Sequence, residues 1–276
     1  MRNISNFTGV HVHCAKRFGV SNRLRSIAGH CALANLFDVP FSYSWLPDPS
    51  CPDALSQLLT SGRLQERSFD DARADPGCLL IHPGSTPTHC GSTVEAIAKA
   101  YVPMEAMHEF DLEISSFLVD LVPTPRIRQR AESILDTLRE GDSGKVLGLH
   151  VRRTDLVSHL AAQGGHLPSD DALFSRVDAF LRSNPDATIF CSTDNPDSEN
   201  QVLRRYPSRV AHHQKHWITD NLNDALDVKV QARLSTLEES IVDLYCLSRC
   251  DFIVGTRGSS FSVFAARWGG RPYVLA

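Results

Sequence analysis

Short apolar segments alternate with amphipathic ones throughout the second half of the chain, and this alternation limits the fold more than any other feature. The apolar runs are too short for helices and read as buried strands. They are expected at residues 146–151, 188–192, 209–211, 251–255 and 272–275. Parallel strands must be joined by crossovers, which are right-handed and usually helical. The pattern therefore predicts a Rossmann-like unit with a parallel sheet.

The segments between these strands carry apolar residues at the spacing of one helical face. Leu173, Val177 and Phe180 keep this spacing within residues 170–182. The string Thr236-Leu237-Glu238-Glu239 has the composition of a capping box and predicts a helix that runs to Cys250. Further helices are expected over residues 126–139, over 259–268, and from Pro196 through Leu203.

The first half opens with one more strand, loop, helix and strand. Residues 9–14 alternate as a strand, a helix is expected over 22–37 with Ser21 or Asn22 as its cap, and 39–45 reads as the next strand.

Prolines interrupt residues 47–125, where only short helices at 53–60 and 94–101 and a strand at 78–82 are expected. A glycine-containing polar segment at 140–144 marks a joint, so two domains are predicted, 1–140 and 141–276.

Composition narrows the class of protein. The chain has 276 residues, is 42% hydrophobic and 22% charged, and can bury real cores. Its formal net charge of −4 argues against nucleic-acid binding. No apolar stretch reaches the roughly 20 residues that span a bilayer, and no signal-peptide core is visible. The eight cysteines form no CxxC pair, which suits reduced, buried thiols in a cytoplasmic protein.

Two adjacent arginines, Arg152 and Arg153, follow directly after the strand at 146–151. Parallel sheets bind ligands at the carboxyl ends of their strands, and guanidinium groups form forked contacts with phosphate oxygens. The arginines therefore indicate an anionic substrate. A solvated turn with a local ion pair to Asp155 is the alternative, because such pairs are common on surfaces.

Other polar residues are expected at the same sheet edge, because every strand-to-helix turn of a parallel sheet opens there. Asp194 follows the next strand, and Gly258, Ser259 and Ser260 begin a helix whose backbone N–H groups suit a phosphate. Asp243 lies in the apolar segment 241–247 and needs a donor. That donor could be a nucleobase edge or a neighbouring backbone or arginine group.

The first half offers a weaker anion site and a weaker metal site. Asn22 and Arg23 stand at the start of the predicted helix, where they could bind an anion or simply be solvated. His11 and His13 could share a metal with Cys14 or with the histidines at 212, 213 and 216, but nothing in the sequence brings these segments together. No metal is therefore predicted.

These residues also carry a family resemblance. The strings at 150–155 (HVRRTD), at 192–195 (STDN) and from Val242 to Ser260 resemble three successive motifs of the α-1,6-fucosyltransferases and bacterial nodulation fucosyltransferases. The segment from Arg17 to Arg23 resembles the glycine-asparagine loop of that superfamily, which includes the protein O-fucosyltransferases. The resemblance covers residues 9–45 and 145–276.

The resemblance implies a GT-B architecture, with two Rossmann-like domains whose parallel sheets face each other across a cleft. Domain 1–140 would lie on the acceptor side and domain 141–276 would bind the nucleotide sugar. The implied reaction is an inverting, metal-independent transfer of fucose from GDP-fucose to a hydroxyl of a glycan or small-molecule acceptor.

Residue by residue, the resemblance assigns roles to the motif positions. Arg152 would bind the β-phosphate and stabilise the leaving GDP, with help from Arg153. Asp243 would pair with the guanine, and Ser259 and Ser260 would hold the diphosphate. The full implied set for nucleotide-sugar binding is Asn22, Arg23, His150, Asp155, Asp194, Asp243, Gly258, Ser259 and Ser260.

The sequence departs from the family at one point that bears on activity. Some fucosyltransferases carry a lysine and a glutamate, proposed as the base, where this chain has Leu156 and Leu160. The general base stays open, and His159 is a nearby candidate that could equally be a surface residue. The alternatives are a transferase for another nucleotide sugar and an inactive nucleotide-sugar-binding protein. A small-molecule kinase is a weaker alternative, because no GxxxxGK[ST] string is present.

Overall fold

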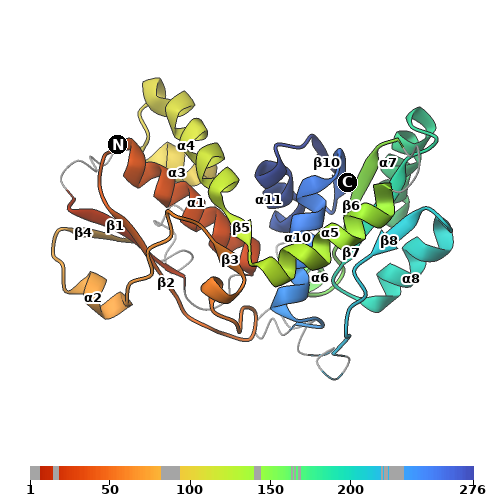
Figure 1. The fold of residues 1–276 in the computed structure, drawn as a ribbon, viewed down its shortest axis with the longest axis horizontal. Coiled ribbons are helices and arrows are strands. Elements are labelled where there is room, and N and C mark those ends of the chain that lie inside the picture. The colour runs from red at the N-terminus through yellow and green to blue at the C-terminus, as the bar shows by residue number, and fades with distance from the viewer. Residues whose placement is uncertain are drawn as a thin grey trace. The chain divides into compact units, whose positions relative to one another are not determined.

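The chain folds into two compact units, Met1–Val122 (unit 1) and Pro123–Ala276 (unit 2), shown in Figure 1. The computed structural model describes residues 7–14, 19–81, 94–139, 144–162, 164, 166, 169–218, 220, 223 and 233–276. The boundary lies earlier than residue 140, because helix α5 (Pro125–Arg139) packs against α10 (Leu237–Arg249) within unit 2. Of the expected joint at 140–144, only Gly144 is among the described residues.

Unit 1 is built on a three-stranded parallel sheet. Strand β1 (Gly9–Cys14) lies between β2 (Phe41–Trp45) and β4 (Cys78–Ile81). Helix α1 (Val20–Leu36) connects β1 to β2, as the sequence predicts.

The expected cap of helix α1 at Ser21 or Asn22 is wrong. The Gly19 carbonyl accepts the first helical hydrogen bonds, from the backbone N–H groups of Asn22 and Arg23, so the helix begins at Val20. Ser21 is buried in the first turn of the helix.

The proline-rich middle of unit 1 contains more helix than the sequence suggests. Helix α4 (Met107–Asp120) packs against α1 and buries Phe110, Ile114 and Phe117. Pro103 and Pro123 flank this helix instead of interrupting it. The expected helix at 53–60 is wrong, because the chain there forms a 3₁₀ turn η1 (Leu55–Gln57) and strand β3 (Leu59–Thr60). The remaining elements are α2 (Phe69–Arg73), α3 (Val94–Tyr101), η2 (Met104–Ala106) and β5 (Val122–Pro123).

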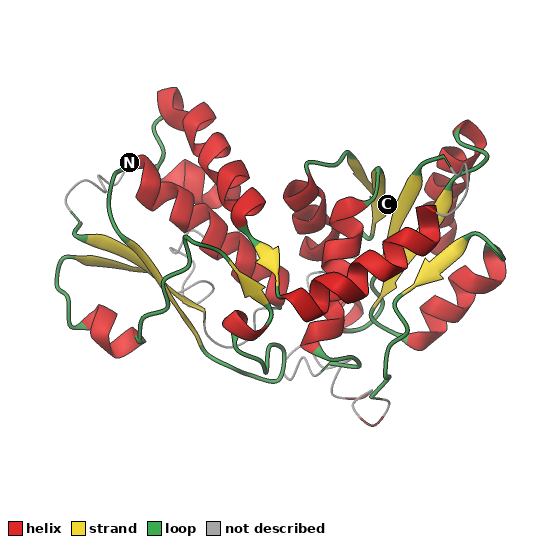
Figure 2. Ribbon diagram, viewed as in Figure 1, coloured by secondary structure: helices red, strands yellow, loops and turns green. Residues whose placement is uncertain are grey.

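Unit 2 holds a five-stranded, fully parallel sheet with helices on both faces (Figure 2). The strand order is β10, β9, β6, β7, β8, which confirms the Rossmann-like prediction. The strands are β6 (Val146–Val151), β7 (Thr188–Thr193), β8 (Val210–His212), β9 (Phe252–Gly255) and β10 (Tyr273–Leu275). The helices besides α5 and α10 are α6 (Asp155–Ala162), α7 (Asp170–Ser183), α8 (Pro196–Arg205) and α11 (Ser260–Gly269).

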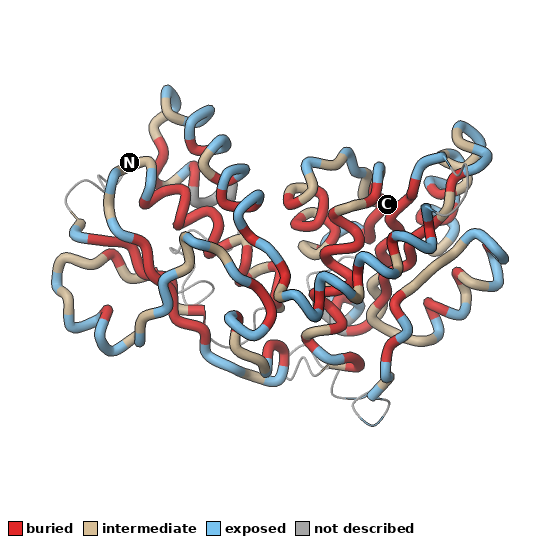
Figure 3. Tube along the Cα trace, viewed as in Figure 1, coloured by how far each residue is buried: buried red, intermediate tan, exposed pale blue. Residues whose placement is uncertain are grey.

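Burial explains why these elements form where they do. Every residue of β6 is buried, and α10 is buried along nearly all of its length (Figure 3). The capping box expected at Thr236 is present, with Glu239 as its second member. The sequence did not predict helix α6, which begins directly after the arginine turn.

The order of the strands reverses at β6. Strand β6 pairs with β7 on one side and with β9 on the other, with His150 opposite both Ser192 and Gly255. In such sheets, ligands bind outside the carboxyl ends of the strands at the point of reversal. The turns that follow β6 and β9 meet there, because the Arg152 backbone N–H donates to Thr256 Oγ1 at 3.1 Å.

Two further sequence predictions concern thiols and membranes. Every cysteine in the described ranges is an unpaired thiol, and burial raises the pKa of Cys14, Cys31 and Cys191 to about 12. Within those ranges, no helix combines the length and the apolarity needed to cross a bilayer.

The contact between α10 and α11 gives a test of the packing in unit 2. A Cβ on Gly269 would lie 1.8 Å from the Ser248 carbonyl oxygen. We expect Gly269→Ala to lower the free energy of unfolding by about 1–3 kcal/mol through overpacking, as measured by urea denaturation. Gly144→Ala is the control, since a Cβ there meets nothing within 4 Å. Equal stability of the two variants would contradict this packing.

Candidate functional site

Asp194 holds the arginine turn at the end of β6. Its Oδ1 accepts a hydrogen bond from the Arg153 backbone N–H at 2.9 Å. Its Oδ2 accepts one from the Thr154 backbone N–H at 3.2 Å and one from Thr154 Oγ1 at 2.6 Å. The same oxygen lies 3.9 Å from Arg152 Nε. Asp194, which the sequence suggested as a ligand-binding residue, is thus used in the structure to shape the turn.

The two arginines have different ion-pair partners. Arg153 donates from Nη2 and Nε to Asp170 Oδ1, at 2.7 and 3.1 Å, and from Nη1 to the Arg152 carbonyl. Burial raises the pKa of Asp170, but hydrogen bonds from Arg153 and Gln201 outweigh it and bring the pKa below its ordinary value. Arg152 has a longer ion pair, with 27% of its side chain exposed at the sheet edge.

The turn after β9 supplies the other side of the site. Thr256 Oγ1 donates to the His150 carbonyl at 3.1 Å, which fixes this turn against β6. Gly258 has a φ of 82°, in the left-handed region that favours glycine. Ser259 caps the ten-residue helix α11, and Ser260 is its first residue. The turns that carry Arg152 and the start of α11 therefore leave the sheet at the same edge.

His150 lies just inside this edge as a neutral ring. It is buried and stacks on Phe261, the second residue of α11, with ring centroids 4.9 Å apart. Burial, together with the charges of Arg152 and Lys215, lowers the pKa of His150 to about 3. An imidazole with this pKa stays uncharged at neutral pH and can offer a flat face or one ring nitrogen to a ligand.

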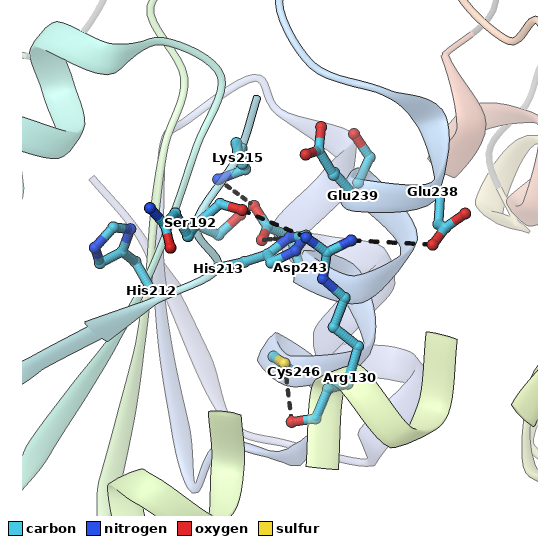
Figure 4. Close-up of polar contacts among 12 residues, drawn as sticks. Arg130, Ser192, His212, His213, Lys215, Glu238, Glu239, Asp243 and Cys246 are labelled. Carbon is cyan, nitrogen blue, oxygen red and sulfur yellow. Dashed lines mark hydrogen bonds and ion pairs between the residues drawn. The ribbon is translucent and has the colours of Figure 1, made fainter. Parts of the chain in front are cut away.

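Asp243 lies buried in the middle of α10, and protein groups supply donors to one of its oxygens. Oδ2 accepts a hydrogen bond from Ser192 Oγ at 2.9 Å and lies 2.9 Å from Lys215 Nζ (Figure 4). Oδ1 lies 3.7 Å from His213 Nδ1 and makes no hydrogen bond in the described part of the chain. Sequence reasoning missed Lys215, because a lysine beyond a short strand gives no signal of burial.

A cavity of about 660 Å³ opens beside the arginine turn within unit 2. Arg153 and Asp170 line one part of it, and Asn195, Arg204 and Trp217 line another. The cavity lies by the carboxyl ends of β6 and β7, next to the edge that holds Arg152. Of the motif residues, Arg153 lines this cavity, whereas Arg152, His150, Asp243, Ser259 and Ser260 do not.

The candidate residues of unit 1 are engaged in that unit. Arg23 is buried, with Nη2 2.8 Å from Asp48 Oδ2 and Nη1 donating to the Leu46 carbonyl at 2.7 Å. Asn22 Oδ1 accepts from Arg25 at 2.7 Å. Arg17, from the loop that suggested a family likeness, lies outside the described residues, as does the side chain of Asp155, whose backbone starts α6.

The histidines of β1 contact serines. Both ring nitrogens of His11 lie 2.9 Å from a serine hydroxyl, those of Ser42 and Ser44, and His13 Nδ1 lies 2.7 Å from Ser44 Oγ. Among the residues that the structure describes, no group of three or more His, Cys, Asp or Glu could hold a metal ion.

Comparison with known proteins finds similarity in fold but not in sequence. No protein-family model and no curated protein matches the sequence. Solved structures do match the fold. NodZ alpha-1,6-fucosyltransferase soaked with GDP-fucose is 16% identical, with a TM-score of 0.51 over 94% of this chain and 92% of that one. Fucosyltransferase NodZ from Bradyrhizobium is 15% identical, with a TM-score of 0.52 over 93% and 92%.

POFUT1 in complex with GDP-fucose has the same fold. It is 13% identical, with a TM-score of 0.54 over 97% of each chain. These matches confirm the expected α/β class and the fucosyltransferase-like fold. At these identities the likeness concerns the fold, so the activity must be argued from the site.

The role of Asp194 in shaping the turn can be measured. Asp194→Ala removes the acceptor of two backbone N–H groups, and we expect it to lower the free energy of unfolding by about 1–3 kcal/mol. Asp197→Ala is the matched control, because Asp197 lies in the first turn of α8 and only its helix-dipole effect of about 0.3–1 kcal/mol is lost. Urea denaturation of both variants gives the comparison. If Asp194→Ala lowers the free energy of unfolding no more than Asp197→Ala does, the turn does not depend on Asp194.

Proposed function

We propose that this protein is an inverting, metal-independent glycosyltransferase that transfers fucose from GDP-fucose to a hydroxyl of a glycan or small-molecule acceptor. One observation supports the proposal: the Arg152 backbone is hydrogen-bonded to Thr256, in the turn that leads to α11, at the reversal point of a parallel sheet. Two solved proteins with this fold, NodZ and POFUT1, were crystallised with GDP-fucose or GDP.

The chemistry explains why these groups suit the reaction. When the bond between fucose and the β-phosphate breaks, negative charge builds up on the diphosphate. Arg152 and the backbone N–H groups at the start of α11 would stabilise that charge, and fixed donors of this kind lower a barrier without reorganising. Arg153, held by Asp170, adds positive charge beside the site. These groups would neutralise the leaving group without a divalent ion.

The proposal also assigns the donor and acceptor to the two units and the nucleotide contacts to residues at the same sheet edge. Unit 2 carries the phosphate-binding groups and would bind the donor, while unit 1 would bind the acceptor. His150, Ser259 and Ser260 would contact the nucleotide diphosphate together with Arg152, and Asp243 would accept from the base. A location in the cytoplasm is part of this proposal.

A second candidate function is nucleotide-sugar binding without transfer. Leu156 and Leu160 stand where some fucosyltransferases carry a lysine and a glutamate, and both pack toward Gly258, within 3.6 and 3.7 Å of where its Cβ would lie. Neither leucine can take a proton from an acceptor hydroxyl. A transferase that uses another nucleotide sugar would use the same phosphate contacts.

Nucleotide binding is the first test. We expect saturating GDP to raise the melting temperature, because a ligand at 100 times its Kd adds about 2.7 kcal/mol to the free energy of unfolding. Arg152→Ala should abolish the shift, whereas Arg182→Ala, at the end of α7, should retain it. No shift with GDP, UDP or dTDP would reject both the transferase and the binding protein.

Metal independence and catalysis are tested together by donor hydrolysis. We expect the protein to release GDP from GDP-fucose at the same rate in EDTA and in Mg²⁺, because arginine and backbone donors carry the leaving-group charge. Loss of hydrolysis in EDTA would contradict metal independence. A protein that binds GDP but neither hydrolyses GDP-fucose nor transfers fucose to any of a panel of glycans would favour the second candidate, nucleotide-sugar binding without transfer.

A further inference from the structure

A buried polar cluster lies on the α10 side of the sheet in unit 2. We call it the Lys215 cluster, and it consists of Ser192, Glu199, His213, Lys215 and Asp243. The Lys215 ammonium lies 2.9 Å from Asp243 Oδ2 and 3.9 Å from Glu199 Oε2. The side chains of Lys215 and Asp243 are 1% and 3% exposed. Figure 4 shows Ser192 and Lys215 approaching Asp243 together.

Lys215 favours the charged form of Asp243, whose pKa is raised overall. Burial raises the pKa of Asp243, and the ammonium of Lys215 is the strongest influence that opposes this rise. Asp243 and Glu199 in turn raise the pKa of Lys215 against the effect of burial, so the lysine stays charged. Without Lys215, the carboxyl group would be buried beside the hydroxyl of Ser192 with no cation next to it.

The cluster also holds polar atoms that have no partner among the described residues. Asp243 Oδ1 and Nδ1 of His150 are buried and make no hydrogen bond there, while the buried ring of His213 lies against the Glu239 backbone. These groups are neighbours, since His150 lies opposite Ser192 in the sheet and His213 lies 3.7 Å from Asp243. Buried polar atoms nearly always find a partner in the protein, in water or in a ligand, so this set suits a ligand that brings its own donors and acceptors.

We propose that Lys215 is a positioning residue for the nucleobase of the donor. Together with Ser192 it occupies Oδ2 of Asp243, which leaves Oδ1 to accept from the N–H groups of a guanine edge. Adenine offers an unprotonated N1 at that edge, which a carboxylate oxygen repels. The inference rests on the proposed function, because it requires a nucleoside diphosphate whose phosphates lie near Arg152, two residues after His150.

Base selectivity separates this role from a merely structural one. Dissociation constants of GDP and ADP would be measured by calorimetry for the wild type, Lys215→Met and Lys215→Arg. We expect the wild type to prefer GDP and Lys215→Met to lose roughly tenfold or more of that preference, as for a lost charge-assisted hydrogen bond. Affinity for ADP, which depends on the phosphate contacts, should change little.

Lys215→Arg keeps a cation beside Asp243, so this variant can still be measured if Lys215→Met does not fold. The forked guanidinium can cover both oxygens of Asp243, so we expect this variant also to lose GDP preference. Arg205→Met is the control, because it removes the cation of another ion pair in unit 2, 2.7 Å from Asp178, and should keep the wild-type preference.

Two results would overturn the inference while leaving the proposed function intact. Both Lys215 variants could keep the wild-type preference for GDP, or they could weaken GDP and ADP binding equally. A wild type that binds neither nucleotide would instead reject the proposed function, and the role of Lys215 with it.

Discussion

The pairing of β6 with β7 on one side and β9 on the other is the constraint on which the proposed site depends. Because all these strands are parallel, the turns after β6 and β9 emerge side by side at one edge. This arrangement brings the Arg152 backbone next to Thr256, in the turn that leads to α11. A strand inserted between β6 and β9 would separate the turn of Arg152 from the turn that leads to α11 and remove the proposed phosphate site.

The charges of unit 2 fall into two groups. Lys215 and Asp243 form a buried pair, and Arg153 is fixed by Asp170, so these charges shape the site. Arg152 lies at the exposed edge and has a longer contact with its protein partner, 3.9 Å from Asp194. Charges that are held in advance suit a reaction in which negative charge grows on a leaving group.

The sequence predicted the sheet of unit 2 well and its side-chain contacts poorly. The strand predicted at 146–151 has the same bounds as β6. An apolar run too short for a helix has few structures open to it other than a buried strand. Helix α4 was missed, since its flanking prolines looked like interruptions although they lie outside it. Asp194 and Lys215 could not have been assigned, because their partners come from distant segments that only the folded chain brings together.

A crystal structure of the protein with GDP tests the central claim most directly. The account predicts the diphosphate between the Arg152 side chain and the backbone N–H groups at the start of α11, with the guanine directed toward Asp243. Density for the diphosphate elsewhere, for example beside Arg23 in unit 1, would contradict it.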